Sequence, residues 1–248
     1  MNIVGIEKRE LLKLKASYID HPLSIKEFMY IAETFDALWK YDYDAAENGK
    51  VGMHAELKSG LHSDMFFVSK ILLEPDSIMQ IISEQIVMKF RKLLCEPDIF
   101  MPDYIVGVPN GATKLGENIS KILNIQTIEM KKIDGRILLV TPIKARKIVL
   151  IIEDFCTKGT GFTEAVGTIM KAQPKAIISH CDPVILNRGG LKNIFIGKKS
   201  FKILPVIEYP VNEWEPKDCP LCKLGSIPIK PKETNENWEA ITTSQLYE

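Results

Sequence analysis

The sequence has no excess of charge of either sign and no long apolar run. Lysine plus arginine and aspartate plus glutamate both number 32, so the formal net charge is zero. Proteins that coat nucleic acid or lie on a membrane surface usually have a basic excess, so neither class of partner is expected. No apolar stretch approaches the roughly 20 residues that cross a bilayer. An anion would therefore bind in a local basic pocket.

Cysteine is scarce and unevenly placed. There are five, an odd number, and Cys95, Cys156 and Cys181 are scattered singly. This usage indicates a reducing compartment and not a disulfide framework. Residues 1–15 are rich in charged side chains, which is unlike a signal peptide or an anchor. We therefore expect a soluble, cytoplasmic protein.

The length of 248 residues suits one domain with elaborations. We expect a helical extension over residues 1–50, a core over residues 51–210 and a C-terminal segment over residues 211–248. Within the extension, Ser24 and Glu27 have the spacing of a helix capping box. Helical spacing of apolar residues follows at Phe28, Ile31, Phe35, Leu38 and Trp39. The Pro-, Lys- and Glu-rich composition from residue 213 onward indicates a loosely packed tail.

Strand and helix patterns alternate through the core. The expected strands cover residues 104–108, 125–130, 137–140, 147–152 and 175–179, and the expected helices cover residues 78–94, 115–123 and 160–171. Alternation at this interval predicts an α/β fold with a mainly parallel sheet flanked by helices.

One segment, residues 148–166, has the residues of a phosphate site. An apolar strand delivers Glu153 and Asp154 at its carboxyl end, where ligands bind in α/β sheets. The loop that follows opens a helix, whose first N–H groups and dipole favour an anion, and its glycines allow close approach. The loop residues Thr157, Lys158, Gly159, Thr160 and Gly161 are thus predicted to bind a phosphate monoester.

The acidic pair extends this prediction to a sugar phosphate. Carboxylates accept hydrogen bonds from sugar hydroxyls, or hold Mg²⁺ through water. Phosphate on one side and a diol on the other describe ribose 5-phosphate. An ordinary strand-to-helix turn is the alternative, since Thr and Gly are common there. A Walker loop and a dinucleotide fingerprint are both absent from the sequence.

This segment resembles the phosphoribosyl pyrophosphate signature of the type I phosphoribosyltransferases. The resemblance implies their fold, with a small hood to which the N-terminal extension contributes. It implies that Glu153 and Asp154 contact the ribose hydroxyls and serve catalysis, and that residues 157–161 hold the 5-phosphate. Mg²⁺ would bridge pyrophosphate and ribose oxygens with few or no direct protein ligands. Cys156 stands at a usually apolar position and is expected to be buried.

Three other segments resemble orotate phosphoribosyltransferases in particular. Residues 57–67 resemble the motif that places Lys58 near the base and Phe66 and Phe67 beside the pyrimidine ring, although a hairpin turn with two core phenylalanines is the alternative. Residues 184–190 resemble the strand end whose arginine contacts orotate, here Arg188, although a solvated turn would also explain it. Residues 104–112 resemble the pyrophosphate loop, with backbone N–H groups contributed by Pro109 to Ala112, namely at Asn110, Gly111 and Ala112.

The mobile catalytic loop of that family has a shortened counterpart. Residues 129–136 keep Lys131 and Lys132 as candidate catalytic residues but lack the family's histidine. The shorter loop favours a sensor without turnover, because a closing loop excludes water and supplies charge to the departing pyrophosphate. A homodimer follows from the resemblance, because the family's loop serves the partner's site.

Cys219 and Cys222 form a CxxC pair near the C-terminus. One pair supplies two of the four ligands of structural zinc, and Cys181, His180 or His21 would complete a site only if the fold brought them close.

The expected reaction converts phosphoribosyl pyrophosphate and orotate to orotidine 5'-phosphate and pyrophosphate, in pyrimidine synthesis. The alternatives are transfer to another nucleobase, or a non-catalytic sensor of phosphoribosyl pyrophosphate or a nucleotide.

Overall fold

A computed structural model of the chain describes residues 1–246. The fold has two compact units, each built from two stretches of sequence. The first contains residues 1–30 and 73–210, and the second contains residues 31–72 and 211–248. The chain passes between the units within helix α2 (Ile25–Thr34), between residues 72 and 73, and between residues 210 and 211. The last of these coincides with an expected boundary, whereas no division falls at residue 50.

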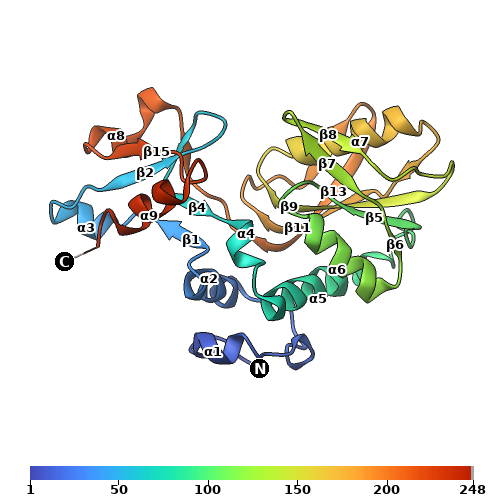
Figure 1. Ribbon diagram of the computed structural model, residues 1–248, viewed down its shortest axis with the longest axis horizontal. Coiled ribbons are helices and arrows are strands. Elements are labelled where there is room, and N and C mark those ends of the chain that lie inside the picture. The colour runs from blue at the N-terminus through green and yellow to red at the C-terminus, as the bar shows by residue number, and fades with distance from the viewer. Residues whose placement is uncertain (247–248) are drawn as a thin grey trace. The chain divides into compact units, whose positions relative to one another are not determined.

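The first unit is built on one large sheet with the order β12-β13-β11-β9-β5-β6, and β10 lies beside β9 (Figure 1). Neighbouring strands from β13 to β6 are parallel, whereas β12 is antiparallel to β13. The predicted, mainly parallel sheet is thus confirmed. The strands are β5 (Tyr104–Gly107), β6 (Gln126–Thr127), β9 (Ile148–Cys156), β10 (Ile177–Ile178), β11 (Cys181–Asn187), β12 (Asn193–Ile196) and β13 (Lys199–Glu208).

Helices cover both faces of this sheet. Figure 1 shows α5 (Asp76–Leu93) and α6 (Thr113–Leu123) on one face, and α7 (Thr160–Ala172) on the other. Beside α7 lies a hairpin of β7 (Met130–Ile133) and β8 (Arg136–Leu139). Because β9 is covered on both sides, its first half is apolar at every position and Val149 to Ile152 are fully buried. The short helices α1 (Lys8–Leu11) and η1 (Ala16–Tyr18) precede α2.

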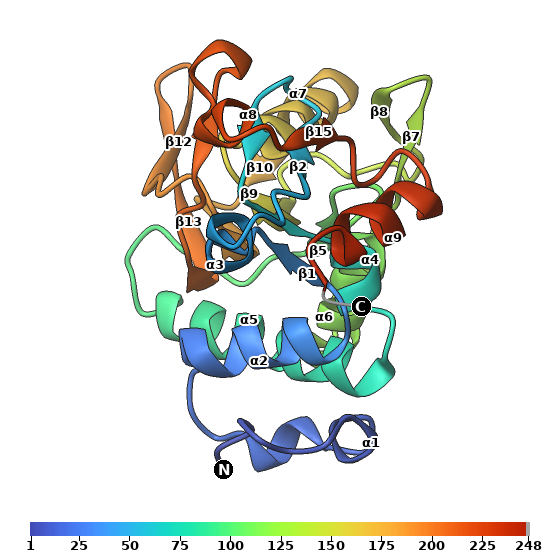
Figure 2. The same cartoon turned by 90° about the vertical axis from the view of Figure 1, so that its left-hand side faces the viewer.

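The second unit joins its two stretches of sequence in one small sheet of order β14-β3-β2-β15. A separate antiparallel pair, β1 with β4, completes its strands. The elements are β1 (Leu38–Lys40), α3 (Tyr43–Glu47), β2 (Met53–Glu56), β3 (His62–Ser63), β4 (Met65–Phe67), α4 (Ser69–Leu72), β14 (Glu213–Trp214), η2 (Pro216–Asp218), α8 (Pro220–Lys223), β15 (Ile227–Ile229) and α9 (Asn235–Thr243). Both views show β15 alongside β2 (Figures 1 and 2).

Two expectations for these end segments are wrong. Leu38 and Trp39 belong to β1 and not to a helix, because they pair with Phe67 and Phe66 of β4. The C-terminal segment is packed and not loose: Cys219 and Leu221 are fully buried, since β14 and β15 extend the sheet that β2 and β3 begin. The shared sheet also explains why residues 51–72 group with the C-terminal segment and not with the expected core.

One local expectation holds. The capping box is confirmed, because the backbone N–H of Ser24 donates to Glu27 at 2.9 Å and that of Glu27 donates to the Ser24 hydroxyl at 3.2 Å. Across residues 1–246, no helix combines the length and the apolar character that crossing a membrane requires.

Candidate active site

Three neighbouring strands of the first unit end at one edge of the sheet. Parallel pairing sets Gly107 of β5 opposite Ile152 of β9, and Glu153 of β9 opposite Val184 of β11. The segments that follow these positions therefore leave the sheet at the same edge. These segments are the loop 108–112, the loop 157–159 and the turn at Arg188. Ligands of α/β sheets bind at this edge, beyond the carboxyl ends of the strands.

The predicted phosphate loop lies between the end of β9 and the start of α7. Gly159 is the residue before the helix and has a left-handed backbone with φ of 67°, which favours glycine. A Cβ at Gly159 would also overlap the side chain of Ile194. Lys158 and Thr160 are exposed and Thr157 is half-buried. The start of α7 therefore presents its first N–H groups and the hydroxyl of Thr160 next to solvent.

The two adjacent acids lie in different environments. Glu153 is 6 % exposed, and its Oε1 accepts the backbone N–H of Phe162 at 3.1 Å. This bond joins β9 to the first turn of α7, and a Cβ on Gly161 would overlap the same oxygen. Glu153 therefore anchors the helix start, and its predicted contact with ribose hydroxyls stays a prediction.

Glu153 also lies beside a second buried acid, Asp182 of β11, which is fully buried. Burial, and then the charge of Asp154, raises the pKa of Glu153 to about 8. Burial and the charge of Glu153 raise the pKa of Asp182 well above its usual range. Because two charges cannot both be kept in this dry space, the pair holds at least one proton at neutral pH. Asp182 was not predicted from the sequence, although an acid within an apolar strand is a signal that could have identified it.

Asp154 is half-buried and faces the neighbouring loop. Its Oδ1 accepts the N–H of Phe155 at 2.9 Å. Its carboxylate fills the space where a side chain on Gly111 would stand. The predicted pyrophosphate loop and the second acid of the motif are thus in direct contact, although they are some forty residues apart in the sequence.

The loop from Val108 to Ala112 is a tight turn between β5 and α6. The N–H of Ala112 donates to the carbonyl of Val108 at 3.0 Å, and the peptide bond between Pro109 and Asn110 is cis. A Cβ on Gly107 would overlap the Ala112 carbonyl, so this turn requires a glycine at the strand end. Asn110 is exposed at the apex.

Arg188 lies against the phosphate loop and not in a solvated turn. Its guanidinium donates to the Thr157 hydroxyl at 3.0 Å and lies 5.7 Å from the centre of the Phe155 ring. Its backbone N–H donates to the Cys156 carbonyl at 2.7 Å. A cation is therefore held beside the predicted anion site.

Cys156 is a packing residue, as expected. It is 1 % exposed, and burial, with the nearby Glu153, raises the pKa of its thiol to about 12. A neutral, enclosed thiol is a poor nucleophile.

The shortened loop is an ordered hairpin. Asp134 and Gly135 form its turn with φ of 48° and 78°. The N–H of Ile137 donates to Glu164 of α7 at 2.8 Å, and the Thr168 hydroxyl donates to the Ile137 carbonyl at 3.1 Å. The hairpin is thus fixed to α7.

Both candidate lysines lie on β7 of this hairpin. Lys131 is exposed and pairs with Glu129 at 3.2 Å, while Lys132 is half-buried. Within residues 1–246, neither lysine is joined to the phosphate loop by a hydrogen bond or an ion pair, so their catalytic role stays a prediction.

The predicted base-binding residues Lys58, Phe66 and Phe67 belong to the second unit. Lys58 is exposed on the turn between β2 and β3, which the N–H of Leu57 closes by donating to the Leu61 carbonyl at 2.7 Å. Phe66 and Phe67 are 8 % and 1 % exposed. This burial favours the alternative of two core phenylalanines over rings that stack on a base.

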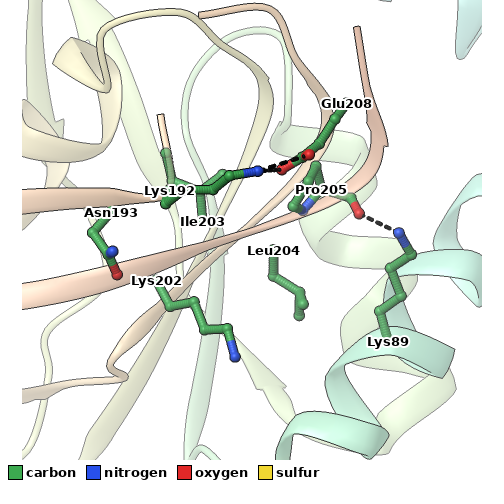
Figure 3. Close-up of a pocket in the computed structure, with 8 residues that line it drawn as sticks. All are labelled: Lys89, Lys192, Asn193, Lys202, Ile203, Leu204, Pro205 and Glu208. Atoms are coloured by element: carbon green, nitrogen blue, oxygen red, sulfur yellow. Dashed lines mark hydrogen bonds and ion pairs between the residues drawn. The ribbon is translucent and has the colours of Figure 1, made fainter. Parts of the chain in front are cut away.

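A hollow of about 480 Å³ opens on another part of the first unit, between β13 and α5 (Figure 3). Its lysines already have partners. Lys89 donates to the carbonyls of Pro205 and Val206, and Lys192 donates to Glu208 at 2.9 Å. With these charges engaged, the hollow is a weaker anion site than the loop at Gly159.

Comparison with known proteins agrees with this geometry. No protein-family model matches the chain. It is 24% identical over 182 residues to the orotate phosphoribosyltransferase of Carboxydothermus hydrogenoformans, which spans 72% of this chain and 88% of that protein. It is 25% identical over 185 residues to the enzyme of the same name from Acidithiobacillus ferrooxidans, with 72% and 87% covered.

A solved structure shares the fold. The crystal structure of orotate phosphoribosyltransferase from Aeropyrum pernix matches with a TM-score of 0.54 at 13% identity, over 73% of this chain and 93% of that one. The sheet and the loop at the end of β9 thus belong to the type I phosphoribosyltransferase fold, and the sequence is similar to those of the orotate phosphoribosyltransferases.

Proposed function

We propose that this enzyme transfers ribose 5-phosphate from phosphoribosyl pyrophosphate to orotate, giving orotidine 5'-phosphate and pyrophosphate. The contact between Asp154 and Gly111 carries the proposal, because it joins the acid of the signature to the predicted pyrophosphate loop. The names of the curated relatives support orotate as the acceptor.

The start of α7 is proposed to hold the 5-phosphate. Backbone N–H groups from Lys158 to Gly161 and the hydroxyls of Thr157 and Thr160 supply donors, and the helix dipole adds a partial positive charge. The bond from Glu153 to Phe162 fixes this first turn to β9. When the 5-phosphate of the substrate is held in place, the reacting carbon of the ribose is positioned for attack. Such positioning accounts for much of the rate enhancement in transfer reactions.

Asp154 is proposed to face the ribose and the pyrophosphate. A half-buried carboxylate next to a tight loop suits a hard cation, so Asp154 fits the role of holding Mg²⁺ through water or through ribose oxygens. When bound, Mg²⁺ would neutralise charge on the departing pyrophosphate. The N–H groups of Asn110 and Gly111 would bind the other side of that leaving group, whereas the N–H of Ala112 is bonded within the turn.

Recognition of orotate is assigned to two cations. The paired N–H groups of the Arg188 guanidinium suit a carboxylate or the carbonyl groups of a base. The hydrogen bond from Arg188 to Thr157 fixes the position of the guanidinium. Lys58, exposed on its turn, would add a second positive charge. Phe66 and Phe67 would act by supporting the strand that follows this turn. We assign Lys131 and Lys132 to the pyrophosphate side of a homodimer's site.

One observation favours a second candidate, a sensor that binds the sugar pyrophosphate without turnover. The hairpin at Lys131 has a two-residue turn and is bonded to α7, whereas a closing loop must move.

The test is a panel of orotate, uracil, hypoxanthine and adenine, each incubated with phosphoribosyl pyrophosphate and Mg²⁺ while pyrophosphate release is measured. Release with orotate alone is expected. Release with a purine alone would overturn the assignments of Lys58 and Arg188. Binding of phosphoribosyl pyrophosphate without release for any base would identify a sensor.

A further inference from the structure

Four side chains able to bind a metal converge within the second unit. His54 lies on β2, His62 on β3, Cys219 precedes α8 and Cys222 lies on α8. One nitrogen or sulfur atom from each lies within 4.8 Å of all the others. His54 and Cys219 are fully buried, and His62 is 5 % exposed. Cys181, His180 and His21, the residues that could have completed a site with the CxxC pair only if the fold brought them close, lie in the first unit and do not belong to this cluster.

The spacing of these atoms matches a tetrahedral ion. His54 Nε2 lies 3.6 Å from Cys219 Sγ and 3.5 Å from Cys222 Sγ, and His62 Nδ1 lies 3.3 Å from Cys222 Sγ. In a tetrahedral zinc site with ordinary bond lengths, nitrogen and sulfur ligands are about 3.6 Å apart. The two nitrogens are 2.9 Å apart and would separate by about 0.4 Å to admit the ion.

A hydrogen bond fixes which nitrogen of His54 faces the centre. The Ser226 hydroxyl donates to the Gly52 carbonyl at 3.2 Å and lies 2.9 Å from His54 Nδ1. Because the Ser226 hydroxyl gives its hydrogen to the Gly52 carbonyl, it can only accept a hydrogen bond from His54. Nδ1 of His54 therefore carries the proton, and Nε2 has a free lone pair for a metal. An outer hydrogen bond of this kind orients metal-binding histidines.

The backbone brings the two pairs of ligands together from distant parts of the sequence. β15 follows α8 directly and pairs with β2, with Pro228 opposite His54. β2 also pairs with β3, with Glu56 opposite His62. Gly225, with φ of 93°, turns the chain from α8 into β15. The cluster thus lies where the two stretches of sequence that form the second unit share one sheet.

We propose that His54, His62, Cys219 and Cys222 bind one Zn²⁺ as a closed structural site. Four protein ligands leave no open position for substrate, which distinguishes a structural ion from a catalytic one. Two thiolates balance the charge of the ion, so a buried site carries no net charge. The ion would cross-link residues 54–62 to residues 219–222 and hold the base of the turn that carries Lys58.

This inference stands apart from the proposed transferase reaction, because its readout is metal content. The full chain, expressed in zinc-supplemented medium and purified without chelator, should contain one zinc per chain by elemental analysis. Replacement by Co²⁺ should give the visible absorption of a tetrahedral site with thiolate ligands. These two measurements use the unaltered chain, so they remain decisive where a variant fails to fold.

Variants then identify the ligands. Cys222→Ser and His62→Ala should each lower zinc affinity by at least about a hundredfold in a chelator competition, while the matched control Cys95→Ser, on an exposed cysteine outside the cluster, should keep full zinc. Ser226→Ala should lower affinity about tenfold to a hundredfold with stoichiometry retained. A metal-free chain, or a Cys219–Cys222 disulfide found by mass spectrometry in chain purified without oxidant, would overturn the proposal.

Discussion

The carboxylate of Asp154 stands where a side chain on Gly111 would be, so the acid of the strand β9 and the loop after β5 are packed without a gap. Gly111→Ala should displace one of the two. Since displacements of about 1 Å can cost a hundredfold in rate, kcat/KM for phosphoribosyl pyrophosphate should fall by about tenfold to a hundredfold. Initial rates of pyrophosphate release measure this.

A matched control exists in the same unit. Gly167 lies in α7, and a Cβ there would meet nothing within 4 Å. Gly167→Ala should leave kcat/KM unchanged and raise the free energy of unfolding by up to about 1 kcal/mol, because alanine favours the helix. Equal losses of activity in the two variants would contradict a specific role for the space at Gly111.

The two acids of the signature should respond differently to amide substitution. Asp154→Asn removes the charge that faces the leaving group, so turnover should fall by about a hundredfold or more. Glu153→Gln keeps an oxygen for the Phe162 N–H and replaces a group that already holds a proton at neutral pH, so turnover should stay within about threefold. Steady-state rates at pH 7 compare them. Equal losses would mean that Glu153 contacts the ribose.

The Glu153–Asp182 pair predicts how stability changes with pH. Between the ordinary glutamate value of 4.5 and about 8, the folded chain keeps a proton on Glu153 that the unfolded chain releases. The free energy of unfolding should therefore fall as pH rises through this range.

Asp182→Asn removes one of the paired acids and offers an N–H to Glu153. It should flatten that decline and stabilise the chain by about 1–2 kcal/mol near pH 8. Urea unfolding at several pH values measures the effect, with the exposed Asp98→Asn as control. If both variants kept the wild-type slope, the buried pair would not be the cause.

Substitution of Arg188 tests whether this residue recognises the base. Arg188→Gln should raise KM for orotate more than KM for phosphoribosyl pyrophosphate, by about tenfold or more, because a charged pair to a carboxylate is lost. Thr157→Val, which removes the hydroxyl that Arg188 contacts, should act mainly on KM for phosphoribosyl pyrophosphate. The opposite ranking would make Arg188 a phosphate-loop residue.

The sequence was enough for features with a local cause. The apolar run before Glu153 and the glycine at residue 159 predicted β9, the loop and α7, because each depends on neighbours in the chain. Features that depend on distant segments were missed. The strand at Leu38 exists through pairing with Phe67, and the burial of Cys219 exists through the sheet shared with His54. Helical spacing and a Pro-rich composition carried no information about those partners.

Within the site, Glu153 and Asp154 also show that features set by distant segments could not be predicted from the sequence. Glu153 and Asp154 are adjacent in the sequence, so one role was predicted for both. The sequence shows that neighbouring side chains on a strand point to opposite faces, but it does not show what each face packs against. The structure buries the first beside Asp182 and turns the second toward Gly111. Only the neighbouring strands β5 and β11 decide which acid meets a ligand.

The most direct test of the central claim is to identify the product formed from orotate, phosphoribosyl pyrophosphate and Mg²⁺. We expect orotidine 5'-phosphate by mass spectrometry, formed in a one-to-one ratio with pyrophosphate and lost with Asp154→Asn. Pyrophosphate without orotidine 5'-phosphate, or no product from chain that binds phosphoribosyl pyrophosphate, would contradict it.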